Sequence, residues 1–159
     1  MVRGPPGFGA MNVSNFKTGE RRDHLLDALR MAGVTASCPV YVPGEDAMPL
    51  LLWLCTRGFG HVIHVPSHAH PAIGPDGVVI VPRTVAPEAL EGALAGCRHM
   101  APGALLVVQT AAARRPEQRR ALGDALEWAG LRVQASIPAS TAREIHVARR
   151  VAPDLKKAA

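Results

Sequence analysis

Runs of unbroken aliphatic residues alternate along this chain with stretches in which apolar residues recur at helical spacing. The aliphatic runs predict buried strands, which fall at 39–43, 61–65, 77–81 and 104–109. The amphipathic stretches predict helices, which begin at Thr18 and stop at Gly33, and then span 50–56, 87–98 and 116–129. Two further strands, at 131–137 and 143–148, are separated only by a short turn.

This order of elements predicts a three-layer α/β architecture. Alternating strands and helices with continuous Val, Ile and Leu strands favour a parallel sheet that helices cover on both faces. The last two strands are too close in sequence for a crossover helix, so they must pair as an antiparallel hairpin. We therefore expect a sheet of about six strands, mostly parallel, that ends in an antiparallel hairpin.

Length and composition favour a single globular domain. The chain has 159 residues, of which 48% are hydrophobic, enough for one buried core. We expect a flexible N-terminal segment at 1–17, the α/β domain at 18–151 and a polar tail at 152–159. No apolar run approaches the roughly 20 residues of a membrane span, and the first residues lack the apolar stretch of a secretory signal.

Cysteine usage points to a reducing, cytoplasmic setting. The three cysteines are odd in number and lack the spacing of a metal site. Cys55 and Cys97 fall inside apolar helical patterns, and we expect both to be buried thiols that act as small hydrophobic side chains.

The net charge of +5 raises the question of nucleic-acid binding. Basic residues gather in two places, at 114–120 and at 149–157. If the two groups converged on one face they would bind a phosphate backbone with salt-sensitive affinity. No aromatic residues are interleaved to stack on bases, so solvated helix faces are the preferred interpretation.

One segment carries a family resemblance. Arg98 ends a helix, Pro102-Gly103 forms a turn, and the aliphatic strand 104–109 follows. This order resembles the "RxLkPGGxLvv" segment of class I S-adenosylmethionine-dependent methyltransferases. The resemblance covers roughly residues 20–150 and implies a Rossmann-like fold, whose sheet also ends in an antiparallel hairpin.

The same resemblance implies where a cofactor would bind. In that family a glycine-rich loop follows the first strand, and here the loop begins at Gly44. The resemblance thus implies Gly44, Glu45 and Asp46 as the cofactor-binding positions. The second and third glycines of the family fall on Asp46 and Met48, whose side chains occupy space that the cofactor needs. The Asp46 carboxylate would also repel the carboxylate of the cofactor's methionine group.

Two further family features are altered. The second strand, 61–65, runs into Pro66, where the family places an acidic residue that binds the ribose hydroxyls. Residues 66–76 are too few, and too rich in proline, for the strand and helix that the family has next. The resemblance therefore indicates a shortened, degenerate member of the family, and a divergent but working enzyme is the alternative.

Four histidines lie within ten residues, at positions 61, 64, 68 and 70. His64, His68 and His70 are candidate ligands of zinc or nickel, because imidazole suits both metals. A polar loop with one or two histidines in a pocket is the alternative. Glu45 and Asp46 admit a second interpretation as well, in which they complement a helix amino terminus.

Three functional hypotheses follow. The first is a non-catalytic methyltransferase-like domain that acts by binding a protein partner or a second copy of itself and holds no cofactor. The second is a divergent methyltransferase that uses S-adenosylmethionine and acts on a small molecule near residues 64–70. The third is a basic, nucleic-acid-associated protein.

Overall fold

The computed structural model describes residues 19–153, and the side chains from residue 24 onward. The predicted N-terminal segment, the Thr18 helix start and most of the predicted polar tail lie outside this range. The described elements, in chain order, are α2 Gly19–Met31, β1 Val40–Pro43, η1 Glu45–Ala47, α3 Met48–Thr56, β2 Val62–Val65, β3 Val78–Val85, η2 Pro87–Ala89, α4 Leu90–Ala93, η3 Ala95–His99, β4 Leu105–Ala111, α5 Pro116–Trp128, β5 Leu131–Ser140 and β6 Arg143–Arg150.

The predicted fold class is confirmed. Six strands form one sheet in the order β2-β1-β3-β4-β6-β5. The first four strands of this order pair in parallel, whereas β6 pairs antiparallel with both β4 and β5. The last strand of the chain therefore lies inside the sheet, and β5 forms one edge.

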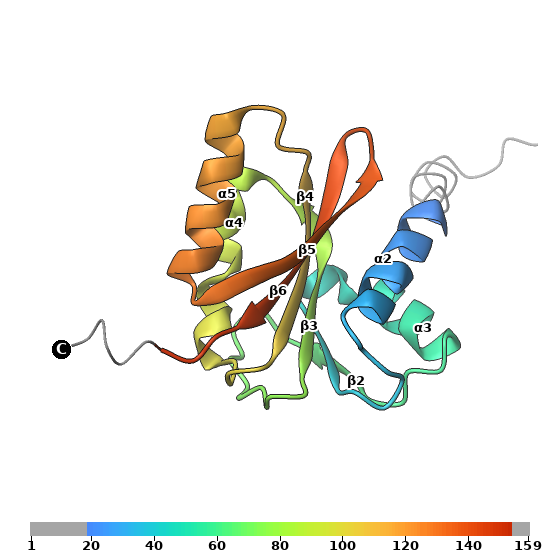
Figure 1. Cartoon of the computed structure of the whole chain (residues 1–159). Coiled ribbons are helices and arrows are strands. Elements are labelled where there is room, and N and C mark those ends of the chain that lie inside the picture. Colours follow the sequence, from blue (N-terminus) through green and yellow to red (C-terminus); the bar gives the residue numbers. More distant parts are fainter. Residues whose placement is uncertain (1–18, 154–159) are drawn as a thin grey trace, which may run out of the picture.

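Helices cover both faces of this sheet (Figure 1). On one face Leu29 of α2 and Leu54 of α3 pack over Val40 and Val42 of β1. On the other face Leu90 of α4 and Leu126 of α5 pack over residues of β4 and β6, in a second apolar cluster. Successive residues of a strand point to opposite faces, so the unbroken aliphatic strands supply both clusters at once.

The prediction of one continuous helix at 87–98 is wrong. The structure breaks it into the 3-10 segments η2 and η3 and the single turn α4. Gly92 and Gly96 fall within this stretch and lower its helix propensity. Leu90, Leu94 and Cys97 are nevertheless buried, so the apolar spacing correctly predicted which side of the segment faces the core.

Four strands end later than the sequence predicts, and two of them, β3 and β5, pass through a proline. β3 continues beyond Pro82 to Val85, with a shift of register against β4 between Ile80 and Thr84. β5 continues through Pro138 on the edge of the sheet, again next to a register shift. Bulges and edges are the places where a sheet tolerates a residue without an N–H group.

The segment between β2 and β3 contains neither a helix nor a strand of the sheet. Within residues 66–77 the only bridge joins Ile73 to Met100. β2 is therefore the second edge of the sheet. None of the helices within residues 19–153 is long and apolar enough to cross a membrane.

Candidate ligand-binding site

The carboxyl ends of β1 and β3 border a cavity of about 420 Å³, here called the outer cavity. Gly44 and Asp46 contribute from the loop after β1, and Arg83 contributes from β3. β2 pairs with one side of β1 and β3 pairs with the other side, so the strand order reverses at β1. In doubly wound sheets, ligands bind in the crevice at such a reversal of strand order.

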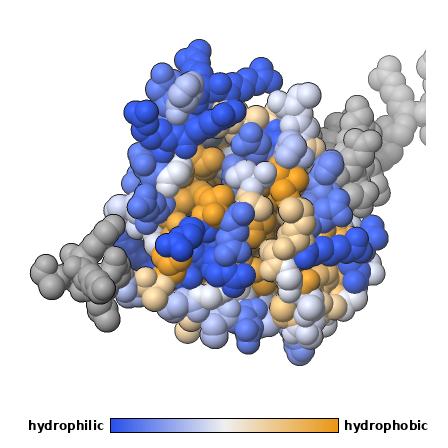
Figure 2. Space-filling view, viewed as in Figure 1, coloured by the Kyte–Doolittle hydropathy of each residue, from blue (hydrophilic) through white to orange (hydrophobic). Residues whose placement is uncertain are grey.

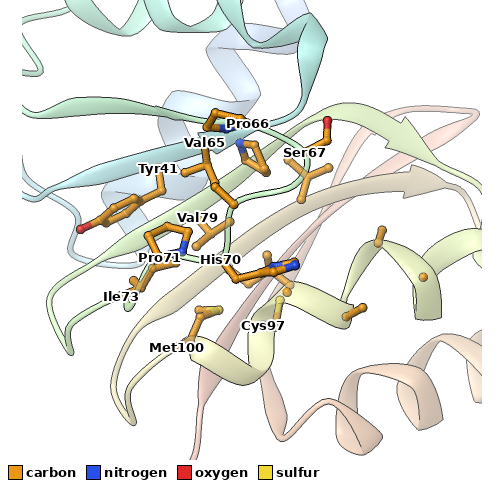
Figure 3. A pocket seen from close by; sticks show the side chains of 18 residues that line it. Tyr41, Val65, Pro66, Ser67, His70, Pro71, Ile73, Val79, Cys97 and Met100 are labelled. Atoms are coloured by element: carbon orange, nitrogen blue, oxygen red, sulfur yellow. The ribbon is translucent and has the colours of Figure 1, made fainter.

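A second, mostly apolar cavity of about 210 Å³, here called the inner cavity, lies on the adjoining sheet face. Tyr41, Val65 and Val79 line it from the sheet, and the helical segment with Cys97 lines the opposite side. Figure 3 shows the His70 ring extending from the loop after β2 toward Cys97. Within the described residues no helix lies between β2 and β3, so the loop after β2 contributes to the cover of this part of the sheet.

The two cavities adjoin, since both are lined by Pro43, Ser67, Val81 and Ala93. Together they form one cleft with an apolar inner part and a charged mouth. The volume of the outer cavity falls within the range of about 300–1,000 Å³ that small-molecule sites occupy. The cleft is therefore a candidate ligand-binding site.

Gly44 forms the turn at the carboxyl end of β1, with a φ of 96° that favours glycine. Its N–H donates to the carbonyl oxygen of Val65 (3.0 Å), and its carbonyl accepts a hydrogen bond from Nε2 of His64 (2.7 Å). The proton of His64 therefore resides on Nε2, because a carbonyl oxygen can only accept. These two hydrogen bonds connect the loop after β1 to β2.

An ion pair between Asp46 and Arg83 lies at the mouth of the cleft. The Arg83 guanidinium binds Oδ2 of Asp46 through both Nε and a terminal nitrogen. The pair joins the loop after β1 to β3, and both side chains are exposed. Glu45 is also exposed. Both acids stand in the first turn of η1, as the interpretation of charges that complement a helix amino terminus expects, but neither η1 nor α3 has a side-chain cap.

The three predicted metal ligands, His64, His68 and His70, do not share a common contact in the structure. His64 binds the Gly44 carbonyl, whereas the His70 ring stacks on His99 with ring centroids 5.3 Å apart. His68 is exposed on the loop between them. In the part of the chain that the structure describes, no three His, Cys, Asp or Glu residues are grouped so that they could hold a metal ion. A metal site at His64, His68 and His70 stays a prediction.

The residues of the cleft do not fit S-adenosylmethionine in the way that the family resemblance implies. Pro66 and Ser67 follow β2, so no carboxylate stands where the ribose hydroxyls would be bound. The carboxylate of Asp46 lies instead in the loop after β1, paired with Arg83. Space is present beside Gly44, since a Cβ built there meets no atom within 4 Å.

The chain matches no known protein family and no curated protein by sequence. It is similar in structure to a SAM dependent methyltransferase from Aquifex aeolicus, with a TM-score of 0.54 and 15% identity over 79% of this chain and 88% of that chain. It is also similar to magnesium protoporphyrin IX methyltransferase from Synechocystis PCC 6803, which was solved with bound SAH. The TM-score is 0.57 and the identity is 13%, over 94% of this chain and 90% of that chain.

The chain has the fold of class I S-adenosylmethionine-dependent methyltransferases. At these identities the likeness establishes the fold alone. The methyltransferase-like fold was implied by residues 98–109, and the structural neighbours confirm that implication.

Sequence reasoning missed the partner of Asp46. Arg83 follows a proline beyond the predicted strand end, and only the continuation of β3 through that proline places it across the cleft. The prediction that Cys55 is buried is wrong, because Cys55 is exposed on α3. The prediction that Cys97 is buried is confirmed. Burial raises the pKa of the Cys97 thiol to about 11, although the charge of Arg150 acts in the opposite direction.

The described members of the two basic groups lie at opposite ends of the sheet. Arg114 and Arg115 precede α5, next to the carboxyl end of β4. Arg149 pairs with Leu105 at the start of β4, and its guanidinium donates to the Gly103 carbonyl (2.7 Å). Figure 2 shows a hydrophilic end of the molecule over the start of α5, and apolar residues in the middle of the same face. One continuous basic surface is therefore not favoured.

Proposed function

We propose that this chain is a methyltransferase-fold domain that acts by binding and not by methyl transfer. The observation that carries the proposal is the Asp46–Arg83 ion pair at the mouth of the carboxyl-end cleft. A ligand carboxylate beside Gly44 would meet the like charge of Asp46. A ligand that used Arg83 would have to displace Asp46 from it.

The partner under this proposal is a protein, either another chain or a second copy of this one. β2 is an edge strand of only four residues, and Ile63 at its centre is 42% exposed. An uncovered strand edge presents unpaired N–H and C=O groups to other chains. Small molecules in the cleft remain compatible with this role, and nucleic acid is the least favoured partner because the two basic groups are apart.

The test is calorimetric titration of the full chain, freed of metal, with S-adenosylmethionine and S-adenosylhomocysteine. We expect no binding at millimolar concentrations of either compound. The variants Asp46→Asn and Glu45→Gln form a matched pair, because each removes one carboxylate from the same loop. A gain of binding in Asp46→Asn alone would show that this carboxylate excludes the cofactor. Micromolar binding by the unaltered chain would contradict the proposal.

A divergent methyltransferase is the second candidate, and the open volume of the cleft favours it. The outer cavity is large enough for a small-molecule ligand, and a neighbour of the same fold was solved with bound SAH. Transfer of a labelled methyl group from S-adenosylmethionine to a small acceptor would establish this activity. Sedimentation analysis of the same sample tests self-association independently.

A further inference from the structure

Three side chains from the adjacent strands β4, β6 and β5 form a hydrogen-bonded row. His146 of β6 lies between Thr110 of β4 and Ser136 of β5. Nε2 of His146 is 2.9 Å from Oγ1 of Thr110, and Nδ1 is 2.9 Å from Oγ of Ser136. Ser136 and His146 are directly paired across the strands. Because Val108 faces His146, Thr110, two residues further along β4, lies on the same face of the sheet.

The surroundings of His146 determine which nitrogen carries the proton. Oε2 of Glu144 lies 3.7 Å from Nε2, and a carboxylate favours a proton on the nitrogen that faces it. We assign the proton to Nε2, which donates to Thr110. Burial lowers the pKa of His146, an effect that the charge of Glu144 opposes. The imidazole is therefore neutral near pH 7, and the lone pair of Nδ1 accepts the hydroxyl proton of Ser136.

The three residues differ in their access to solvent. Thr110 and His146 are almost completely buried, at 0% and 2% exposure. Ser136 is exposed on the edge strand β5. A reagent in solution therefore reaches the hydroxyl while the base behind it stays shielded from water. A hydroxyl bonded to an imidazole that a third group orients is the arrangement that activates serine nucleophiles.

We propose that Ser136 is a nucleophilic serine, activated by His146 and oriented through Thr110 and Glu144, that reacts with activated phosphoryl and acyl compounds. In the reaction with a fluorophosphonate, Oγ of Ser136 forms a bond to phosphorus and the P–F bond breaks. The fluoride leaves with the electron pair of that bond, and the hydroxyl proton passes to Nδ1 of His146. The resulting imidazolium faces the carboxylate of Glu144. This site is independent of the cleft and of the proposed binding role.

Ser140 provides an internal control on the same strand. Its Oγ accepts a hydrogen bond from the Ala142 N–H (3.2 Å), and it is exposed like Ser136. The two serines therefore differ in their contact with an imidazole and share strand and solvent access. Comparing their rates of modification in one sample cancels differences in reagent, temperature and folding.

The experiment treats the full chain with a fluorophosphonate at pH 7.5 and measures labelled peptides by mass spectrometry over time. We expect Ser136 to react at least about tenfold faster than Ser140, since general-base assistance contributes about 10²–10⁴-fold in enzymes. The advantage disappears in urea. His146→Gln and Glu144→Gln each lower the Ser136 rate, and Ser136→Ala removes the fast adduct.

Circular dichroism shows whether each variant is folded. If His146→Gln does not fold, the pH profile of the unaltered chain decides the matter, because the Ser136 rate must then rise as His146 loses its proton, with a midpoint below pH 6.5. Equal rates at Ser136 and Ser140 would overturn the proposal. A fast Ser136 reaction that a folded His146→Gln variant retains, or that shows no such midpoint, would overturn it as well.

Discussion

The two halves of the sheet differ in what covers them and in what they hold. In the parallel half, β1 and β2 have four residues each, and a loop replaces the helix that would cover one face beyond β2. Both described cavities of the cleft lie there. In the antiparallel half, β5 and β6 have ten and eight residues, and α5 packs over the sheet. That half encloses the hydrogen-bonded row around His146.

The comparison shows that the length of the strands and the presence of a covering helix decide which parts of one sheet can bind a ligand or partner and which parts enclose polar groups. Where strands are short and a covering element is missing, the sheet leaves space and an open edge, which are the requirements for binding. Where a helix covers the strands, buried polar side chains such as Thr110 and His146 are stabilised by partners inside the protein. Burial of this kind also shifts the pKa of a group and gives it distinct reactivity.

The largest expected effect tests the packing of the antiparallel half. Leu126→Ala removes a side chain of α5 that is 1% exposed, and we expect it to lower the free energy of unfolding by about 3 kcal/mol. The control is Leu52→Ala in the other half, where the side chain is 60% exposed and the loss should stay within about 0.5 kcal/mol. Urea denaturation measures both, and equal losses would contradict the comparison.

The next prediction concerns thiol reactivity. The pKa of Cys97 is raised from 9.0 to about 11, so its thiolate fraction at pH 8 is about a hundredfold below that of an ordinary thiol. The exposed Cys55 should react with a disulfide reagent within the mixing phase, and Cys97 only when the protein unfolds. Peptide mapping after timed quenching identifies each site. Rapid modification of Cys97 in the folded chain would show that the inner cavity admits the reagent.

A third prediction concerns pH. The pKa of His146 is lowered by burial from its ordinary 6.5, so the unfolded chain binds a proton more readily than the folded one. The free energy of unfolding contributed by this group is complete above pH 6.5 and falls as the pH drops toward the lowered value. The urea midpoint should therefore decrease between pH 7 and 5. In His146→Gln this component of the decrease should vanish, and an unchanged slope would contradict the assignment.

The smallest effect concerns the ion pair at the cleft mouth. Asp46 and Arg83 are 57% and 69% exposed, so Asp46→Asn should change the free energy of unfolding by less than about 1 kcal/mol. The role of the pair would then lie in binding and not in stability. The matched variant Glu45→Gln should have a comparable, small effect. A loss well above that of Glu45→Gln would show that the pair holds the β1 loop in place.

Local patterns allowed most of the fold to be predicted. All six strands were predicted, four of them from apolar runs, and the short turn before Arg143 required an antiparallel hairpin, because a parallel return needs a crossover. The failures have local causes as well. Gly92 and Gly96 break the helix predicted at 87–98, and a bulge lets β3 pass through Pro82. Low local helix propensity accounts for the first failure, whereas at Pro82 the pairing of β3 within the sheet overrode the local signal of a proline.

The candidate site could be predicted only in part. The family resemblance implied Gly44, Glu45 and Asp46 as cofactor-binding positions, and the structure places all three on the lining of the outer cavity. The partner of Asp46 lies 37 residues away on β3, and no local pattern reports which side chain another strand brings opposite a loop. The same holds for the row of Thr110, His146 and Ser136, which is formed by three strands.

The sequence by itself determined the layers of this protein: which segments are strands, which face of each helix is apolar, and that the sheet ends in a hairpin. These properties depend on the spacing of apolar and polar residues along the chain, and that spacing is set by residues close together in the sequence. Only the tertiary structure decided that Arg83 pairs with Asp46 and that His146 bonds to Ser136. Contacts between side chains on different strands depend on register and on bulges, and these are set by how the whole sheet packs.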